Sequence, residues 1–329
     1  MARKIKNESS VLAQNVRGMY NAHPFPNRIN TLERRSDDRF SYIYKEFLHL
    51  PFMEFDHKVF LDAGCGTGEN TWFWHRNLKP SNKVIAIDIS HNSINIARKT
   101  NGSEEGFSPL FSIASLLDIP MPSSSVDIVF CSGVLVAVTD PKRAYSELIR
   151  ILKPGGYIIL VLYHRYGRAL HGIRRAIINL IEPNDINRRA QLGGKLFGRS
   201  MRKLAEEEQV PYEGLLYDQF GLPCETRYSV GGILKWFNQS CIEYRGTWPP
   251  IEWSQFGKAL RFSYKLAPYK NNIIFKLLER IFPTKIEAPN TPPRIITRAT
   301  MEFLWGLGQL QLFAIMGQKK VCTGKNGAI

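Results

Sequence analysis

The amino-acid sequence predicts an α/β protein built on a doubly wound, parallel sheet of seven strands. Between residues 58 and 162, short apolar runs alternate with helical segments, the pattern of strands joined by crossover helices. A glycine-rich turn, "GCGTG" at residues 64–68, joins the first run to the first helical segment. The chain has 329 residues, of which 44% are apolar, which is enough for one such domain with substantial additions.

Seven segments have the composition of strands. Each is a short, mostly apolar run, and "KVFLDAG", "KVIAIDIS", "VDIVFCSG" and "YIILVLYH" are the strongest. In chain order the seven span residues 58–64, 83–90, 106–115, 126–133, 157–164, 241–248 and 310–320. We expect the last of them to lie at an edge of the sheet.

The segments between the strands favour helices. Residues 140–156 begin with Asp140 as N-cap and Pro141 in the first turn, and the sequence "PGG" stops the helix. The other predicted helices span residues 69–78, 91–100, 165–190, 229–240 and 254–288, and those at 165–190 and 254–288 are basic. Residues 287–294 read as an exposed linker.

These signals divide the chain into four parts. Residues 1–50 form an N-terminal helical cap, and residues 51–162 form the core. Residues 163–228 form a helical lid insertion. Residues 229–329 complete the core sheet and carry a second basic helical insertion, at about 250–305. We expect the cap and both insertions to lie over the carboxyl ends of the strands as a lid.

The net charge of +15 resides in the outer segments, because residues 51–162 are nearly neutral. Such a surplus attracts an anionic partner, or it serves solubility alone, and the sequence leaves both open. No run of about 18 apolar residues indicates a membrane span, although contact with a membrane surface stays open. The basic, polar start lacks the apolar stretch of a secretory signal, so we expect a cytoplasmic protein.

The cysteines predict neither disulfides nor a metal site. They are odd in number and form no C-x-x-C pair, which is typical of reduced thiols inside cells. They are Cys65, Cys131, Cys224, Cys241 and Cys322. No histidine has H-E-x-x-H spacing either, and we expect no metal.

The glycine turn predicts a ligand site. Its position at the carboxyl end of the first strand is where doubly wound sheets bind ligands, and bare backbone lets a ligand approach closely. Asp88, which ends the second strand, suits two ribose hydroxyls. Together with "DIPMPSSSVDIV" and "RILKPGG", the motif "DAGCGTG" resembles the class I S-adenosylmethionine-dependent methyltransferases over residues 58–162. This resemblance implies a Rossmann-like fold and S-adenosylmethionine as cofactor.

The resemblance also implies which residues hold that cofactor. Four would line its methionine end, namely Asp62, Gly64, Gly66 and Gly68. Asp88 would hold the ribose, and Ile89 would pack on the adenine. Ser115, followed by Leu116, stands where the family usually has an acidic residue for the adenine amino group, and its hydroxyl would accept the same hydrogen bond more weakly. Cys131 would lie near the sulfonium, where a small buried residue favours a structural role over a chemical one.

The catalytic residues are less determined. Relatives often carry a histidine after strand four, where this chain has Val136 and Ala137, so the wall is aliphatic and the base lies elsewhere or is not needed. In the N-terminal segment, Tyr20 could bond the cofactor carboxylate, and His23 could act as base. His164 directly follows strand five and is the second candidate base. Asp218 is a third.

The predicted function is methyl transfer to an oxygen, nitrogen or carbon atom of a small molecule. An aromatic lid with basic surroundings suits a largely apolar acceptor, such as a natural product, quinone or isoprenoid, that can carry an anionic end. One alternative is an RNA or tRNA methyltransferase, favoured by the pI of 9.6 but lacking a recognisable RNA-binding module. Another is a non-catalytic cofactor-binding subunit. The "RILKPGG" passage disfavours a nicotinamide-dependent oxidoreductase.

Overall fold

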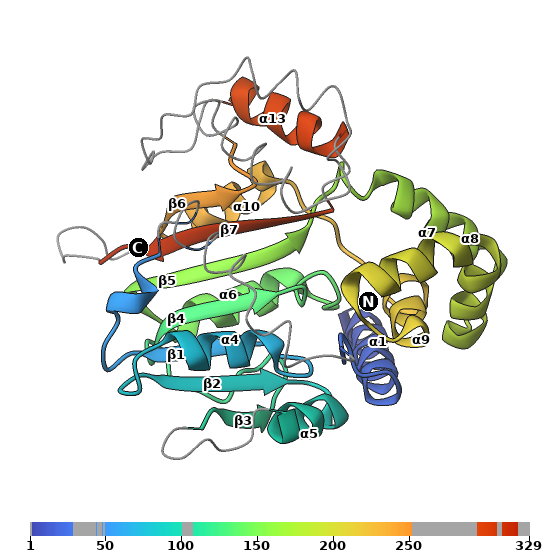
Figure 1. Ribbon diagram of the computed structural model, residues 1–329. Coiled ribbons are helices and arrows are strands. Elements are labelled where there is room, and N and C mark those ends of the chain that lie inside the picture. The colour runs from blue at the N-terminus through green and yellow to red at the C-terminus, as the bar shows by residue number, and fades with distance from the viewer. Residues whose placement is uncertain are drawn as a thin grey trace.

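A computed structural model describes residues 2–28, 44, 48, 50–100, 108–251, 295–307 and 311–321. Its centre is one seven-stranded sheet with the order β3-β2-β1-β4-β5-β7-β6 (Figure 1). The strands are β1 (Val59–Ala63), β2 (Lys83–Asp88), β3 (Leu110–Ile113), β4 (Val126–Ser132), β5 (Leu152–Tyr163), β6 (Ile242–Trp248) and β7 (Leu312–Lys319). All seven lie within or overlap the predicted segments.

The sheet is mixed rather than wholly parallel. Strands β1 to β5 pair in parallel, whereas β7 is antiparallel to both β5 and β6. The prediction that residues 310–320 form an edge strand is wrong, because β7 lies between β5 and β6. The physical reason is burial on both faces: Phe313 and Ile315 join one core cluster, while Ala314 and Met316 join the other.

Helices cover both faces of the sheet. On one face, α4 (Glu69–Asn77) places Trp74 against Phe60 and Phe130, with ring centroids 5.7 and 5.5 Å apart. The opposite face is covered by α6 (Pro141–Ile151), α10 (Val230–Gln239) and α13 (Ile295–Leu307), whose apolar residues share a single cluster. Helix α5 (His91–Thr100) packs beside β2 and β3, at the edge of the sheet that β3 forms (Figure 1).

Helix α6 begins as predicted and ends earlier. The Asp140 side chain accepts a hydrogen bond from the Arg143 backbone N–H at 3.0 Å, which caps the helix. The helix stops at Ile151, and β5 already begins at Leu152, so the "PGG" sequence lies inside the strand. Gly155 adopts a φ of 81°, a left-handed conformation that glycine accommodates without strain.

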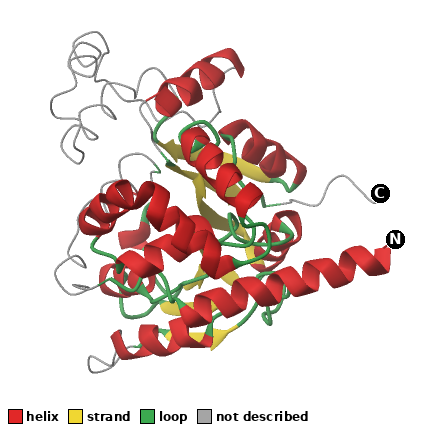
Figure 2. Ribbon diagram, turned by 90° about the vertical axis from the view of Figure 1, so that its right-hand side faces the viewer, coloured by secondary structure: helices red, strands yellow, loops and turns green. Residues whose placement is uncertain are grey.

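A further group of helices gathers at the carboxyl ends of the parallel strands (Figure 1). They are α1 (Ala2–Ala22), α7 (Ala169–Ile181), α8 (Ile186–Glu208), α9 (Tyr212–Leu216) and the π-helix η2 (Tyr217–Gly221). Figure 2 shows that the N-terminal end of α1 projects beyond the rest of the protein. The predicted helix at 254–288 and the linker at 287–294 lie outside the described residues.

Candidate cofactor and acceptor site

The glycine turn between β1 and α4 is enclosed by two other segments. Gly64 and Gly66 have φ values of 83° and 52°. A Cβ on Gly64 would lie 2.2 Å from a methyl group of Val134, and a Cβ on Gly66 would lie 2.6 Å from the Phe25 carbonyl oxygen. Only glycine fits at these two positions, so the turn presents bare backbone at the carboxyl end of β1.

Asp62 has one carboxylate oxygen without a partner. Its Oδ2 accepts a hydrogen bond from the Thr71 hydroxyl at 2.6 Å, whereas its buried Oδ1 has no hydrogen-bond partner among the described residues. Burial raises the pKa of Asp62 to about 7, against the opposing effect of the Thr71 hydrogen bond. An unpartnered buried oxygen of this kind suits a ligand that brings a hydrogen-bond donor.

Asp88 fixes the shape of the turn. Its Oδ2 accepts a hydrogen bond from the Gly66 backbone N–H at 2.9 Å, and its Oδ1 accepts one from the Ser90 N–H at 2.8 Å. Burial raises the pKa of Asp88, while these backbone hydrogen bonds lower it. Each carboxylate oxygen can accept a second hydrogen bond, so the predicted contact with a ribose remains compatible with this geometry.

The predicted adenine-side residues follow β2 and β3. Ile89 is half-buried, and Leu116 is buried. The Ser115 hydroxyl oxygen accepts a hydrogen bond from the Leu117 N–H at 3.2 Å, which leaves its proton available for another partner. Cys131 is fully buried in the core, and burial raises the pKa of its thiol to about 12. Next to it, a Cβ on Gly133 would meet no atom within 4 Å, so open space lies at the end of β4.

The predicted aliphatic wall lies beneath another loop. Val136 and Ala137 are buried, and their carbonyl oxygens accept hydrogen bonds from the Thr226 N–H at 2.8 Å and the Cys224 thiol at 3.3 Å. The Tyr228 hydroxyl also donates to the Leu135 carbonyl at 2.8 Å. Residues 224–228 therefore cover this stretch.

The N-terminal segment crosses the same edge of the sheet. The Tyr20 carbonyl oxygen accepts a hydrogen bond from the Ser90 hydroxyl at 3.1 Å, and the Asn27 N–H donates to the Thr67 hydroxyl at 3.1 Å. Arg28 lies 2.8 Å from Glu69 at the start of α4. These contacts fasten the end of α1 and the residues that follow it across the glycine turn.

A buried polar cluster lies beside this segment. The Tyr20 hydroxyl donates to Asp218 Oδ1 at 3.3 Å, and the Tyr163 hydroxyl donates to Oδ2 at 3.5 Å. The Gln219 amide donates to the same Oδ2 at 2.8 Å. Burial raises the pKa of Asp218, and the nearby Arg168 charge opposes that effect. Asp218 thus joins α1, β5 and η2 through a carboxylate that has no direct ion pair among the described residues.

A second carboxylate in the cluster is fully paired. Glu225 lies 3.1 Å from Arg168, 3.7 Å from Arg175 and 3.6 Å from His171. Burial alone would raise the pKa of Glu225, but these three neighbours lower it to about 2. The Arg168 guanidinium also lies 3.7 Å from the centre of the Tyr163 ring.

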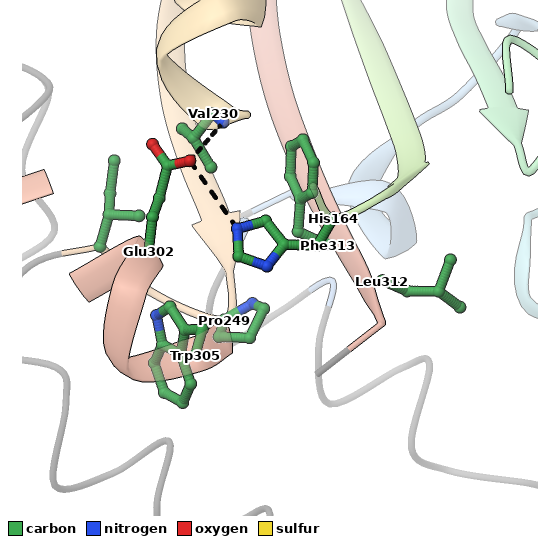
Figure 3. A pocket seen from close by; sticks show the side chains of 8 residues that line it. His164, Val230, Pro249, Glu302, Trp305, Leu312 and Phe313 are labelled. Atoms are coloured by element: carbon green, nitrogen blue, oxygen red, sulfur yellow. Dashed lines mark hydrogen bonds and ion pairs between the residues drawn. The ribbon is translucent and has the colours of Figure 1, made fainter. Parts of the chain in front are cut away.

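The two candidate histidines lie in different places. His23 is half-buried and stacks on Tyr217, with ring centroids 3.4 Å apart and an interplanar angle of 12°. His164 is buried directly after the end of β5, where its Nε2 lies 3.7 Å from Glu302 of α13 (Figure 3). Its Nδ1 accepts a hydrogen bond from the Gly167 N–H. The structure therefore brings Tyr20, His23 and Asp218 together and leaves His164 apart from them.

Residues 61–160 match the protein family described as a methyltransferase domain. Residues 61–160 form a class I methyltransferase domain. S-adenosylmethionine is the cofactor of this class, and the bare glycine turn with the unpartnered Oδ1 of Asp62 fits that cofactor. The matched region contains the turn, Asp88 and the strand-four segment, and it excludes the helices at the carboxyl edge.

Three relatives show how far the similarity extends. An uncharacterised protein of Synechococcus sp. is 28% identical over 198 residues, which cover 56% of this chain and 47% of that protein. Malonyl-[acyl-carrier protein] O-methyltransferase of Serratia marcescens is 31% identical over 99 residues, which cover 30% of this chain and 36% of that protein. Ubiquinone/menaquinone biosynthesis C-methyltransferase of Saccharophagus degradans is 30% identical over 130 residues, which cover 39% of this chain and 52% of that protein. The chain thus spans about half or less of the length of these relatives.

The sequence did not single out the cluster around Glu225. Arg168, His171 and Arg175 have the i, i+3, i+7 spacing of one helix face, which was a usable signal. A basic helix face is more often exposed to solvent than buried. Glu225 lies 50 residues after Arg175, so sequence spacing could not predict that these basic residues pair with it.

The raised pKa of Asp62 predicts a pH-dependent effect of Asp62→Asn. Between about pH 4 and pH 7 the folded wild type retains a proton that the unfolded chain releases, so its stability falls as the pH rises. Asparagine lacks this proton. The variant should therefore gain stability relative to wild type with rising pH, by up to about 4 kcal/mol at ~1.36 kcal/mol per pKa unit. Urea unfolding at several pH values measures this difference.

Asp127→Asn is the control of opposite sign. Partial burial alone would raise the pKa of Asp127, but the Lys153 and Val59 hydrogen bonds lower it. This variant should therefore lose stability relative to wild type as the pH rises toward about 4, the ordinary value for an aspartate, and the difference should stay level above it. A flat difference between Asp62→Asn and wild type across the range would contradict the inferred state of Asp62.

Proposed function

We propose that the chain transfers a methyl group from S-adenosylmethionine to a small, largely apolar acceptor. One observation carries the proposal: Tyr20 connects the cofactor turn to the buried polar cluster. Its carbonyl accepts from Ser90, whose N–H donates to Asp88, and its hydroxyl donates to Asp218. The cofactor side and the acceptor side therefore meet at one residue on the carboxyl edge of the sheet.

The residues of the turn would hold the cofactor. Asp62 Oδ1 would accept from its amino group, Asp88 would accept from the ribose hydroxyls, and Ile89 and Leu116 would flank the adenine. Ser115 has a hydroxyl proton available at that end. Tyr20 donates its hydroxyl proton to Asp218, so we assign it to positioning Asp218 rather than to the cofactor carboxylate.

The acceptor would occupy the space beside Gly133, next to the aromatic residues of the lid. Tyr20 and Tyr163 donate to Asp218, and His23 stacks on Tyr217, which precedes Asp218 in the chain. Rings of this kind favour an apolar molecule. By their names, two relatives methylate an oxygen and a carbon atom respectively. Methylation of oxygen, nitrogen or carbon is compatible with the site.

Asp218 is the proposed general base. The bound cofactor supplies a methyl group on a positively charged sulfur, and the reaction is an in-line displacement by the acceptor. An acceptor hydroxyl would release its proton to Asp218, whose carboxylate Gln219, Tyr20 and Tyr163 hold in place. Positioning by the lid supplies much of the rate.

Two substitutions test the cofactor site. Gly66→Val should abolish S-adenosylhomocysteine binding, because its side chain would enter the space beside the Phe25 carbonyl. Asp88→Ala should weaken binding by about 1.5–3 kcal/mol, the typical value for hydrogen bonds to a charged group. Isothermal titration calorimetry measures both. Gly18→Ala is the matched control, because a Cβ there meets no atom within 4 Å.

Circular dichroism must show that Gly66→Val is folded. Undiminished binding by the folded Gly66→Val variant would overturn the cofactor assignment. Normal cofactor binding without any methyl transfer would instead favour the non-catalytic subunit.

A third substitution tests the base. Asp218→Asn should lower turnover about 10²–10⁴-fold with S-adenosylhomocysteine affinity unchanged, because the amide cannot take up the proton. The assay follows tritium from labelled S-adenosylmethionine into an organic-solvent extract of cells that express the protein. His23→Ala and His164→Ala are parallel variants.

Full turnover by Asp218→Asn, with a large loss in His23→Ala, would move the base to His23. Transfer into total tRNA at a rate matching the extract would favour the RNA methyltransferase, and transfer into polar sugars or amino acids would contradict the apolar acceptor.

A further inference from the structure

Helix α7 has its polar face inward and its apolar face outward. Among its buried residues are His171 and Arg175. The outward face carries five large apolar side chains in i, i+3/i+4 spacing, with exposed fractions between 45% and 85%: Leu170, Ile173, Ile177, Leu180 and Ile181. A contiguous exposed apolar stripe of this kind indicates a contact surface rather than scattered surface residues.

Buried charges fix this orientation. Arg168, just before α7, and Arg175 and His171 within it surround Glu225. Arg175 also donates to the carbonyl oxygens of Gln219 and Leu222, at 2.6 and 2.7 Å. Rotating α7 to bury its leucines and isoleucines would take Arg175 and His171 away from the buried Glu225 and leave Arg227, at 3.7 Å, as a cation outside α7, which is unfavourable. The apolar stripe is therefore held outward by the interior of the protein.

Basic side chains predominate around the stripe, and Glu182, which follows Ile181, lies 4.0 Å from Arg188. The sequence of α7 contains Arg174 and Arg175 and no acidic residue, and Arg165 is exposed one turn before the helix. Arg174 lies over the Phe197 ring, with 5.0 Å to its centroid, beside the outward face. The chain as a whole carries a net charge of +15.

We propose that the outward face of α7 docks on the surface of an anionic phospholipid bilayer. An amphipathic helix with arginines at its flanks lies in the plane of the membrane interface and buries its apolar face there. At 13 residues, α7 is too short to span a bilayer, and no helix in the described part of the chain is long and apolar enough to cross one. A second copy of this face would bring like charges together, so charge complementarity favours the membrane.

This docking would place the acceptor site beside a source of apolar molecules. Helix α7 follows β5 almost directly, and Tyr163 at the end of β5 donates to Asp218. In Figure 1, α7 lies at the end of the sheet toward which the β5 arrow points. The membrane contact itself does not depend on the proposed chemistry, since it follows from α7 alone.

Vesicle sedimentation tests the proposal with the full chain. Wild type should bind vesicles of phosphatidylcholine with phosphatidylglycerol, and part of this binding should persist in high salt, where purely electrostatic attachment is lost. The triple variant Leu170→Gln/Ile173→Gln/Ile177→Gln should bind these vesicles roughly 10- to 100-fold more weakly. Ile113→Gln is the control for a change at an exposed isoleucine elsewhere, because Ile113 is 49% exposed on the edge strand β3. Arg165→Gln/Arg174→Gln should reduce the preference for anionic over neutral vesicles.

Thermal unfolding and calorimetric binding of S-adenosylhomocysteine should be unchanged in the triple variant, which shows that fold and cofactor site are intact. Equal vesicle binding by wild type and the folded triple variant would overturn the proposal, as would no binding by wild type. A dimer in light scattering that the triple variant converts to a monomer would assign the face to a second copy instead.

Discussion

The Asp88 carboxylate is the contact on which the site depends. A turn of glycines has few side chains to fix its own shape, and Asp88 supplies that constraint by accepting from the Gly66 and Ser90 backbone N–H groups. Ser90 in turn donates its hydroxyl proton to the Tyr20 carbonyl, so the constraint extends to α1. One carboxylate at the end of β2 thus constrains both the glycine turn and the segment that lies across it.

The buried polar cluster holds two carboxylates, Glu225 and Asp218, whose surroundings shift their pKa values in opposite directions. Glu225 lies within 3.7 Å of three arginines, Arg168, Arg175 and Arg227, which keep it ionised, and it serves to hold α7. Asp218 receives hydrogen bonds from Tyr20, Tyr163 and Gln219, and burial raises its pKa. Neighbouring groups whose environments move their pKa values apart are typical of acid–base sites. Glu225 therefore has a structural role, whereas the surroundings of Asp218 suit a group that accepts a proton.

The predictions from sequence succeeded where the signal is local. The helix start at Asp140 and the seven strands follow from capping and apolar runs, which depend on neighbours in the chain. The position of β7 was predicted wrongly, because an apolar run does not say which strands will flank it. For the site, the roles of Asp62 and Asp88 stay predictions, and the structure adds the unpartnered oxygen and the backbone contacts. The location of His164 depends on Glu302, which lies 138 positions away, and no spacing rule reaches that far.

Hydrogen–deuterium exchange with and without S-adenosylhomocysteine tests the central claim most directly. If the glycine turn and the α1 end form one cofactor site through Asp88, the ligand should slow exchange of amides in residues 64–68, 88–90 and 20–28 together. Exchange at β3 and at the outer face of α7 should stay unchanged. Protection confined to other segments, or a turn that responds without residues 20–28, would contradict the account.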